Sequence, residues 1–264
     1  MEQYSGYTTY YEDDSKKIKK LDNAFLACVD SYKIHHWEIP AMISGNILKR
    51  CGYFSTLPQQ LTKISTIDRS RLTTLACGCE CNLTSSDYDS SSSVFLTPAA
   101  CLHFYPMLEK KSVYNEIVTT LARVYRYEEG HFIPGVRQWD FAVREFVAVG
   151  SESFVREFLS DMETKLYALA NSFNGLVSLK NANDHFYPSK MNDLKECFQK
   201  SNSLKKELLV NIGGTNVAIA SFNYHGLHFS KEFNFDKKGK IVTGCVGCGI
   251  DRWVKYVNNN KSME

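Results

Sequence analysis

VYRYEEGHFIPGVRQWDFAVREFVAVG, residues 124–150, is the stretch that decides the fold of this chain. Polar and apolar residues alternate from Asp140 to Val149, which predicts an antiparallel strand, and VYRYE predicts another strand before it. A loop of roughly nine residues with glycine and proline joins the two. Further strands cluster along the chain without regular β-α-β alternation. We therefore expect an α+β fold with a mostly antiparallel sheet flanked by helices.

The side chains of this hairpin suit a nucleotide. Arg126 and Glu128 are two residues apart on the first predicted strand and share a face. Phe141 and Glu145, four apart on the second, also share one. Arginine binds phosphate bidentately, an aromatic ring stacks on adenine, and a carboxylate accepts its amino group. Taken alone, however, the pattern favours a solvated hairpin with surface ion pairs.

Helical and strand patterns continue on both sides of the hairpin. We expect residues 1–22 to form a flexible tail and residues 23–264 a single domain. The other predicted elements are a helical stretch at 23–50 broken at Pro40, a strand at 73–81, a strand from Val94 that turns at Pro98, a helix and a strand within 115–127, a helix at 153–173, a polar and partly helical stretch at 181–206, strands at 207–212 and 217–224, and a C-terminal helix.

The composition is that of an ordinary globular protein. The 264 residues include 31 Lys+Arg and 29 Asp+Glu, so the overall charge does not indicate a basic face for binding nucleic acid. No apolar run has the length of a membrane span, and the polar N-terminus is not a signal peptide, so we expect a cytoplasmic protein without a membrane partner. The nine cysteines include Cys77, Cys79 and Cys81. These suggest a metal site, but ordinary strand cysteines are favoured because the Cys-x-x-Cys spacing is absent.

A second glycine-rich motif, GCVGCGIDRW, occupies residues 244–253. Its pattern predicts a strand end, a glycine turn and the start of the C-terminal helix. Arg252 would lie in the first turn of that helix, where a cation opposes the helix dipole. We therefore expect an anionic partner, such as a phosphate, although the glycine spacing alone is weak evidence.

Together the two motifs resemble the second and third signature motifs of class II aminoacyl-tRNA synthetases. The matching residues are Tyr125-Arg126-Tyr127-Glu128, then Arg137, Phe141 and Glu145, and later Gly247-Cys248-Gly249-Ile250-Asp251-Arg252. Trp37-Glu38-Ile39-Pro40 resembles the first motif, in which a proline ends a helix at a dimer interface. The resemblance implies the class II synthetase catalytic fold and a homodimer through residues 23–40 and the segment that follows.

The resemblance narrows to amino acid:[carrier protein] ligases, relatives of archaeal-type seryl-tRNA synthetases that lack a tRNA-binding domain. LTPAACLHFYPML, VREFVAVGS, NANDHFYP, ASFNYHGLHF and CVGCGIDRW carry it. It implies ATP-dependent adenylation of a small amino acid, such as glycine or alanine, and transfer to the phosphopantetheine thiol of a carrier protein rather than to tRNA. The candidate docking surface is the polar stretch 192–206, with a solvated helix face as the alternative; its lysines are Lys195, Lys200, Lys205 and Lys206.

The resemblance also implies roles for individual residues. In ATP binding, Arg126 would hold the α-phosphate and Arg252 the γ-phosphate. Phe141 would stack on the adenine ring, and Glu128 would accept a hydrogen bond from its amino group. Arg137 would also contact ATP, and Mg²⁺ would bind its phosphates. Zinc would be held by Cys101, Glu145 and Cys245, with an open position for the substrate's amino group. Asn223 and His225 are expected to contact the substrate, and for His225 and His228 packing is an equal alternative.

Some residues depart from the family pattern. Cys248 and Asp251 stand where Phe and Glu are common. Ala218 stands where a glutamate often handles the magnesium of ATP, with Glu207 or Glu232 as substitutes. This keeps open a non-catalytic paralogue that acts as a binding or regulatory subunit, beside a truncated aminoacyl-tRNA synthetase. The sequence names neither the amino acid nor the carrier.

Overall fold

The computed structural model describes residues 6–72, 88–89, 92–130, 132–236 and 238–260. Its main sheet has the order β1-β6-β7-β11-β10-β9-β8 and is antiparallel except for the parallel pair of β1 and β6. The strands of this sheet are β1 (Ile34–His36), β6 (Glu116–Tyr125), β7 (Asp140–Gly150), β8 (Val177–Asn181), β9 (Lys205–Ile212), β10 (Thr215–Gly226) and β11 (Val242–Gly249). Two small sheets pair β2 (Met42–Ser44) with β5 (Val94–Leu96) and β3 (Thr66–Ile67) with β4 (Tyr88–Asp89).

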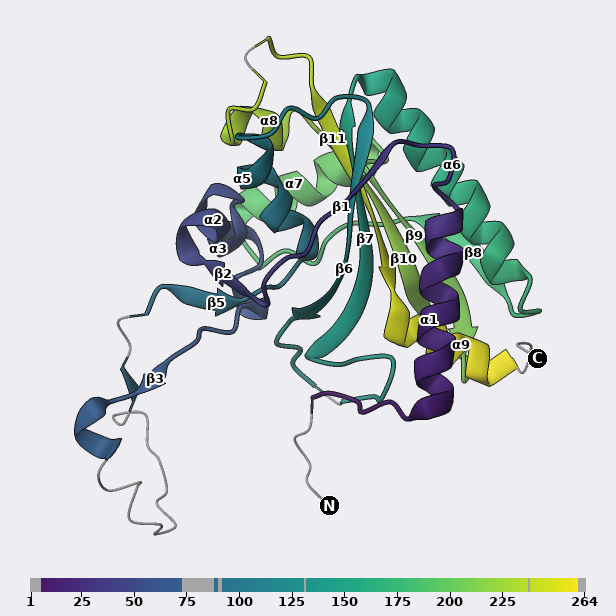
Figure 1. Cartoon of the computed structure of the whole chain (residues 1–264), viewed down its shortest axis with the longest axis horizontal. Helices are drawn as coiled ribbons and strands as arrows, with labels where there is room; N and C mark the ends of the chain where they lie inside the picture. The colour runs from purple at the N-terminus through teal and green to yellow at the C-terminus, as the bar shows by residue number, and fades with distance from the viewer. Residues whose placement is uncertain (1–5, 73–87, 90–91, 131, 237, 261–264) are drawn as a thin grey trace.

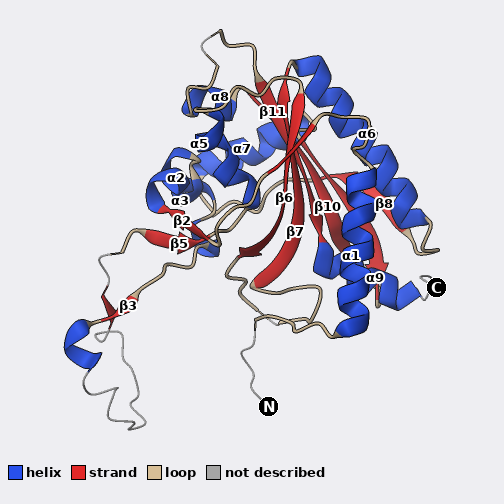
Figure 2. Ribbon diagram, in the orientation of Figure 1, coloured by secondary structure: helices blue, strands red, loops and turns tan. Residues whose placement is uncertain are grey.

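Helices lie on both sides of the main sheet (Figures 1 and 2). The helices on one side are α1 (Glu12–Ala27), α6 (Glu152–Asn171) and α9 (Ile250–Asn260). The helices on the other side are α2 (Gly45–Arg50), α3 (Tyr53–Thr56), α5 (Phe104–Leu108), α7 (Lys190–Ser201) and α8 (His228–Glu232). The short 3₁₀ helices are η1 (Pro58–Gln60), η2 (Arg69–Arg71) and η4 (Ala100–His103). The predicted α+β fold with a mostly antiparallel sheet is confirmed.

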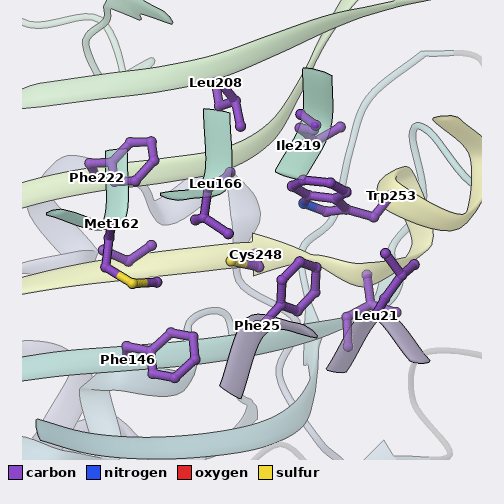
Figure 3. Close-up of a cluster of buried hydrophobic side chains, with 14 of the residues drawn as sticks. Leu21, Phe25, Phe146, Met162, Leu166, Leu208, Ile219, Phe222, Cys248 and Trp253 are labelled. Atoms are coloured by element: carbon purple, nitrogen blue, oxygen red, sulfur yellow. The ribbon is translucent and has the colours of Figure 1, made fainter. Parts of the chain in front are cut away.

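The larger hydrophobic core lies between the sheet and the three long helices. Phe25 of α1 packs edge-on against Trp253 of α9 with ring centroids 5.1 Å apart, above Phe146 and Cys248 of the sheet (Figure 3). The apolar residues of α6 recur with the period of a helix, and the hydroxyl of Ser151 caps its first turn. Among the described helices, none is long and apolar enough to cross a membrane.

The first helix begins much earlier than the sequence predicted. The flexible tail expected over residues 1–22 is wrong for 12–22, which belong to α1. Acidic residues fill its first turn, where they favour the helix dipole. Leu21 and Phe25, one turn apart, are fully buried against the sheet. The apolar contacts that stabilise this helix come from distant elements, so its charged local sequence resembles a tail.

Other local predictions also differ from the structure. The helix expected within 115–127 is absent from these described residues, because β-branched side chains from Ile117 to Thr120 favour the extended β6. The helical stretch at 23–50 is interrupted by β1 and β2, whose hydrogen bonds come from other strands. β11 continues directly into α9, without the predicted glycine turn. The strand expected at 73–81 and its three cysteines lie outside the described residues.

β7 separates two environments. Arg144 points toward α1, where it binds Asp22, whereas its neighbour Glu145 points to the opposite face. Both side chains are buried. The face that carries Glu145 is covered by the shorter helices and holds the predicted functional residues.

Candidate functional site

Two cysteines and a glutamate meet on this second face of the sheet. Cys101 comes from η4, Glu145 from β7 and Cys245 from β11, and their ligand atoms all lie within 4.8 Å of one another. All three are buried. The strand register explains the meeting, since Glu145 pairs with Gly247 and Cys245 with Val147, which places both side chains on the same face of adjacent strands. We call these three residues the Cys-Glu-Cys cluster.

Gly247 keeps the space beside Glu145 open. A Cβ at this position would lie 3.0 Å from Oε2 of Glu145 and 3.5 Å from Oγ of Ser221. A larger residue would therefore press on the carboxylate and displace it from the cysteines.

Burial controls protonation of the cluster. It raises the pKa of Glu145 to about 7, against hydrogen bonds from Cys245 and Cys101 and the charge of Arg126. A hydrogen bond with Cys101, together with burial, raises the pKa of the Cys245 thiol well above its usual value. Two sulfurs and one carboxylate oxygen, with a fourth tetrahedral position open, are a donor set that zinc prefers. A bound cation would stabilise the deprotonated ligands. The residues present therefore fit a zinc ion.

Asn223 borders the cysteine end of the cluster, and His225 lies two residues farther along β10. Nδ2 of Asn223 donates to Sγ of Cys245 over 3.5 Å. Nδ1 of His225 lies 3.1 Å from Oγ1 of Thr243 and 3.4 Å from the hydroxyl of Tyr105. Burial lowers the pKa of His225 to about 3, so its ring is neutral.

Aromatic rings fill the space next to His225. The ring of Tyr105 stacks on the ring of Phe229 with centroids 3.7 Å apart. The rings of His225 and Phe229 meet in a T-shaped contact. His228, by contrast, is exposed at the start of α8. Both histidines contact the ring of Phe229, but His225 is half-buried and His228 is exposed.

Arg126 and Phe141 meet on the same face of the sheet. Arg126 follows the last residue of β6, and its Nε donates to the carbonyl oxygen of Pro98 over 2.8 Å. Its guanidinium carbon lies 5.5 Å from the ring centroid of Phe141. Because Arg126 also lowers the pKa of Glu145, the predicted phosphate-binding arginine acts electrostatically on the Cys-Glu-Cys cluster.

Glu128 lies in the loop that joins β6 to β7 rather than on a strand. This β6–β7 loop is longer than expected, because the amide of Tyr127 donates to the carbonyl of Gln60 instead of continuing the ladder with β7. The predicted shared strand face for Arg126 and Glu128 is therefore wrong. Within the loop, Arg137 forms an ion pair with Glu128 over 3.4 Å.

Arg252 lies in the first turn of α9, as predicted. Its Nε donates to the carbonyl oxygen of Val136 over 2.8 Å, and its Nη1 to that of Ala218 over 2.9 Å. These hydrogen-bond partners are backbone carbonyls rather than the anion we expected. Burial and the charge of Arg126 lower the pKa of Arg252, while carboxylates that include Glu207 oppose this effect. The two arginines and Glu207 thus share one electrostatic environment.

Glu207 faces the site, and Glu232 lies elsewhere. Glu207 pairs with Ser221 across β9 and β10, on the face that carries the Cys-Glu-Cys cluster. Its Oε1 lies 3.3 Å from Nζ of Lys205. Glu232 belongs to α8 and lies 3.9 Å from an arginine of α2. Of the two substitutes suggested for a carboxylate at Ala218, the geometry favours Glu207.

Sequence reasoning missed an ion pair beside Glu207. Nζ of Lys205 lies 2.6 Å from Oδ1 of Asp184, and the lysine side chain is only 11% exposed. Burial opposes ionisation of Asp184, but Lys205 and Gln199 hold its pKa below the usual value. The acid lies between β8 and α7 and the lysine begins β9, and no spacing rule links them.

The lysines of residues 192–206 do not form the single docking surface that we predicted. Lys195 is exposed on α7. Lys205 and Lys206 belong to β9 and point to opposite faces of the sheet, since Lys206 pairs with Glu163 of α6 over 2.7 Å. The side chain of Lys200 lies outside the described part of the chain.

Comparisons with known sequences identify two groups of relatives. No family model matches the chain. Two curated relatives from Bradyrhizobium diazoefficiens, amino acid–[acyl-carrier-protein] ligases 1 and 2, are 27% and 26% identical over 234 and 275 residues. The alignments cover 81% and 94% of this chain and 68% and 75% of those proteins. A type-2 serine–tRNA ligase from Methanocaldococcus jannaschii is 29% identical over 170 residues, 60% of this chain and 33% of that protein.

Solved structures share the fold. A seryl-tRNA synthetase from M. kandleri, in complex with A. aeolicus tRNASec, matches with a TM-score of 0.79 and 18% identity over 100% of this chain and 55% of that chain. A prolyl-tRNA synthetase from Cryptosporidium parvum, complexed with halofuginone and AMPPNP, matches with a TM-score of 0.64 and 14% identity over 92% of this chain and 45% of that chain. This chain thus spans about half the length of these synthetases. It has the fold of the class II aminoacyl-tRNA synthetases, and its sequence relatives are amino acid–[acyl-carrier-protein] ligases and type-2 serine–tRNA ligases.

Proposed function

We propose that this protein adenylates a small amino acid with ATP and transfers it to the phosphopantetheine thiol of a carrier protein, in the cytoplasm. The observation that carries this proposal is that one sheet face holds both the Cys-Glu-Cys cluster and the pair of Arg126 and Phe141. The names of the two bacterial ligases support a carrier protein as the acceptor.

In the first step the carboxylate of the amino acid attacks the α-phosphorus of ATP. An oxygen–phosphorus bond forms, the bond to the bridging oxygen breaks, and pyrophosphate leaves with the electron pair. The attacking carboxylate is already ionised, so no general base is required. Catalysis then consists of positioning and charge stabilisation.

The residues of the nucleotide end take separate roles in this proposal. Arg126 holds the α-phosphate, and Arg252 the γ-phosphate. Phe141 stacks on adenine, Glu128 accepts from its amino group, and Arg137, paired with Glu128, completes the ATP contacts. Mg²⁺ accompanies the phosphates, as it does in most nucleotide sites.

The Cys-Glu-Cys cluster would hold a zinc ion, which would supply a Lewis acid for the neutral amino group of the substrate. Asn223 and His225 then border the substrate. The stacked rings of Tyr105 and Phe229 lie next to His225, and we propose that they restrict the substrate to a small side chain. This supports glycine or alanine as the class of substrate.

In the second step the thiol of the carrier attacks the carbonyl carbon of the adenylate. A carbon–sulfur bond forms, the bond from the carbonyl carbon to the phosphate oxygen breaks, AMP leaves with the electron pair, and the proton of the thiol passes to solvent. We propose α7 as part of the docking surface, because Lys195 is exposed there and carriers are generally acidic. Met191 and Leu194 on the same helix are 64% and 67% exposed, so apolar contact area is also present.

We also propose a homodimer, with a modified interface. Of the residues 23–40 first expected at the interface, only 23–27 are helical, as the end of α1, and Phe25 there is buried inside its own subunit. We propose the outer edge of β6 as the interface instead. β1 pairs only with residues 117–119 of β6, and Leu121 beyond them is 46% exposed. Light scattering that shows a monomer at micromolar concentration would contradict this proposal.

A second candidate function is a non-catalytic binding subunit. Ala218 offers no side-chain carboxylate to magnesium, and its carbonyl is occupied by Arg252. Such a protein would retain the fold and the zinc but form no adenylate.

Pyrophosphate exchange with a panel of amino acids tests the proposal. Zinc-loaded protein should exchange with a small amino acid, and Arg126→Ala should slow exchange by roughly 10²–10³-fold. Arg123→Ala is the matched control, because this arginine is exposed and pairs with Asp140; its rate should stay within about twofold. Exchange with no amino acid would refute adenylation and favour the binding subunit.

The acceptor is tested by supplying ATP, labelled amino acid, and either holo-carrier or bulk tRNA. Label on the carrier thiol, released by hydroxylamine, is the expected result. Label on tRNA without label on any carrier would refute the proposed acceptor and favour a truncated aminoacyl-tRNA synthetase.

A further inference from the structure

The segment at residues 6–11 lies against the β6–β7 loop (Figure 1). The carbonyl oxygen of Gly6 accepts hydrogen bonds from the amides of Trp139 over 2.7 Å and Asp140 over 3.2 Å, where β7 begins. Gly6 has a φ of +53°, and a Cβ there would lie 2.9 Å from the Trp139 ring. The position therefore requires glycine. This segment belongs to the part that the sequence predicted to be a flexible tail.

Gln138 connects the segment to the loop and to α9. Its Oε1 accepts hydrogen bonds from the hydroxyl of Thr8 and from the amide of Gly135. Its Nε2 donates to Oδ1 of Asp251 over 3.0 Å. The side chain is only 4% exposed, so these contacts are made out of water and are costly to break.

Asp251 collects contacts from three parts of the chain. Its Oδ1 accepts from the hydroxyl of Tyr10 over 2.8 Å, and its Oδ2 from the amide of Ala142 over 2.6 Å. Burial and the charge of Asp251 raise the pKa of Tyr10, so the phenol remains a donor. Ala142 directly follows Phe141, and Asp251 directly precedes Arg252. The carboxylate of Asp251 therefore links the two backbone segments that carry Phe141 and Arg252, both predicted to bind ATP.

We infer that residues 6–11 are a strap that holds the β6–β7 loop in the conformation that receives ATP, with Tyr10 acting through Asp251 as a positioning residue. The strap binds the end of the loop at Trp139, and the first turn of α9 binds the loop at Val136 through Arg252. A loop that is ordered before ATP arrives does not lose conformational entropy on binding. The inference rests on the proposed function in that the ligand is ATP.

The Thr8→Val/Tyr10→Phe double variant tests the strap, because it removes two hydroxyls and retains the ring of Tyr10. Tyr11→Phe is the matched control, since this neighbouring side chain is 82% exposed. Calorimetry with zinc-loaded protein measures the Kd for ATP, kinetics give the KM for the amino acid, and hydrogen exchange follows residues 133–142. We expect roughly tenfold weaker ATP affinity and faster hydrogen exchange in the double variant only. A tenfold loss of affinity corresponds to the contribution of about one hydrogen bond to a charged group. The KM for the amino acid and the zinc content should not change.

The outcomes separate the strap from the proposed function. Unchanged ATP affinity in the double variant, with normal ATP binding by the wild type, overturns the strap alone. A parallel loss of ATP and amino acid affinity indicates general loosening and also overturns it. A wild-type protein that binds no ATP removes the proposed function and the strap's ligand together.

Discussion

Replacing Asp22 with alanine tests how α1 is held on the sheet. Nε and Nη2 of Arg144 donate to the two carboxylate oxygens of Asp22 over 2.6 and 2.7 Å. The two side chains are only 7% and 15% exposed. Without Asp22 the guanidinium stays buried beside Thr119 and lacks its carboxylate. Breaking a buried pair in this way costs about 3–5 kcal/mol, whereas an exposed pair contributes about 0–1 kcal/mol.

The free energy of unfolding of Asp22→Ala should therefore fall by about 3–5 kcal/mol. At about 2–4 °C per kcal/mol for a chain of this size, the Tm should fall by roughly 6–20 °C. Urea and thermal unfolding followed by circular dichroism measure both quantities. Lys20→Ala is the matched control, because this side chain of the same helix is exposed; its effect should stay within about 0.5 kcal/mol.

The double variant Asp22→Ala/Arg144→Met distinguishes the unpaired charge from lost packing. Replacing both partners of a buried pair by apolar groups is often neutral, so most of the stability should return. A loss below about 1 kcal/mol in Asp22→Ala would refute the buried pair, and with it the packing of α1 against β7 described above.

Three further predictions concern the Cys-Glu-Cys cluster. Elemental analysis should find about one zinc per chain, and Cys101→Ala should lose it; full retention would point to Cys77, Cys79 and Cys81 instead. Burial raises the pKa of Glu145 to about 7, so below that pH zinc must displace a proton from this carboxyl group. Protonation of Glu145 should therefore lower the zinc affinity about tenfold for each pH unit below 7. Above pH 7 the carboxylate is already ionised and should add no pH dependence. Competition with a chelator across pH measures this slope against Glu145→Gln, because the two thiols also lose protons on binding zinc in both proteins; equal slopes below pH 7 in the two proteins would contradict the prediction. Gly247→Val should weaken zinc binding by roughly 10–100-fold through displacement of Glu145, and unchanged zinc affinity would show that the carboxylate does not need this space.

Much of the site could be predicted because its residues lie in motifs with local spacing. The alternation in β7 predicted the strand of Phe141 and Glu145, and the structure places Arg126 beside that same ring. The helical period predicted α6 to within two residues at each end. The Cys-Glu-Cys cluster was expected from a resemblance, and the structure brings its three residues together. Whether they bind zinc, and what the site does, remains a prediction.

The positions that sequence reasoning missed depend on contacts between distant segments. The charged pattern of α1 predicted a tail, because the partners of Leu21 and Phe25 lie on other elements. The end of β6 is decided by Gln60, more than sixty residues earlier in the chain, which takes the amide of Tyr127. The strap depends in the same way on Asp251 near the opposite end of the chain.

The sequence by itself determined the class of fold, the order of the motifs and the residue types that bear the chemistry, because these follow from local periodicity and side-chain chemistry. Only the tertiary structure decided which side chains share a space. The alternation of side chains along a strand is local, but strand register and helix packing decide what each face meets: Arg144 meets Asp22 of α1 and Glu145 meets two cysteines, while Lys205 meets Asp184 and Lys206 meets Glu163 of α6. Burial then determines the protonation of Glu145 and His225, because loss of water penalises the charged form. Register and burial arise from contacts across the whole chain, so a local pattern does not specify them.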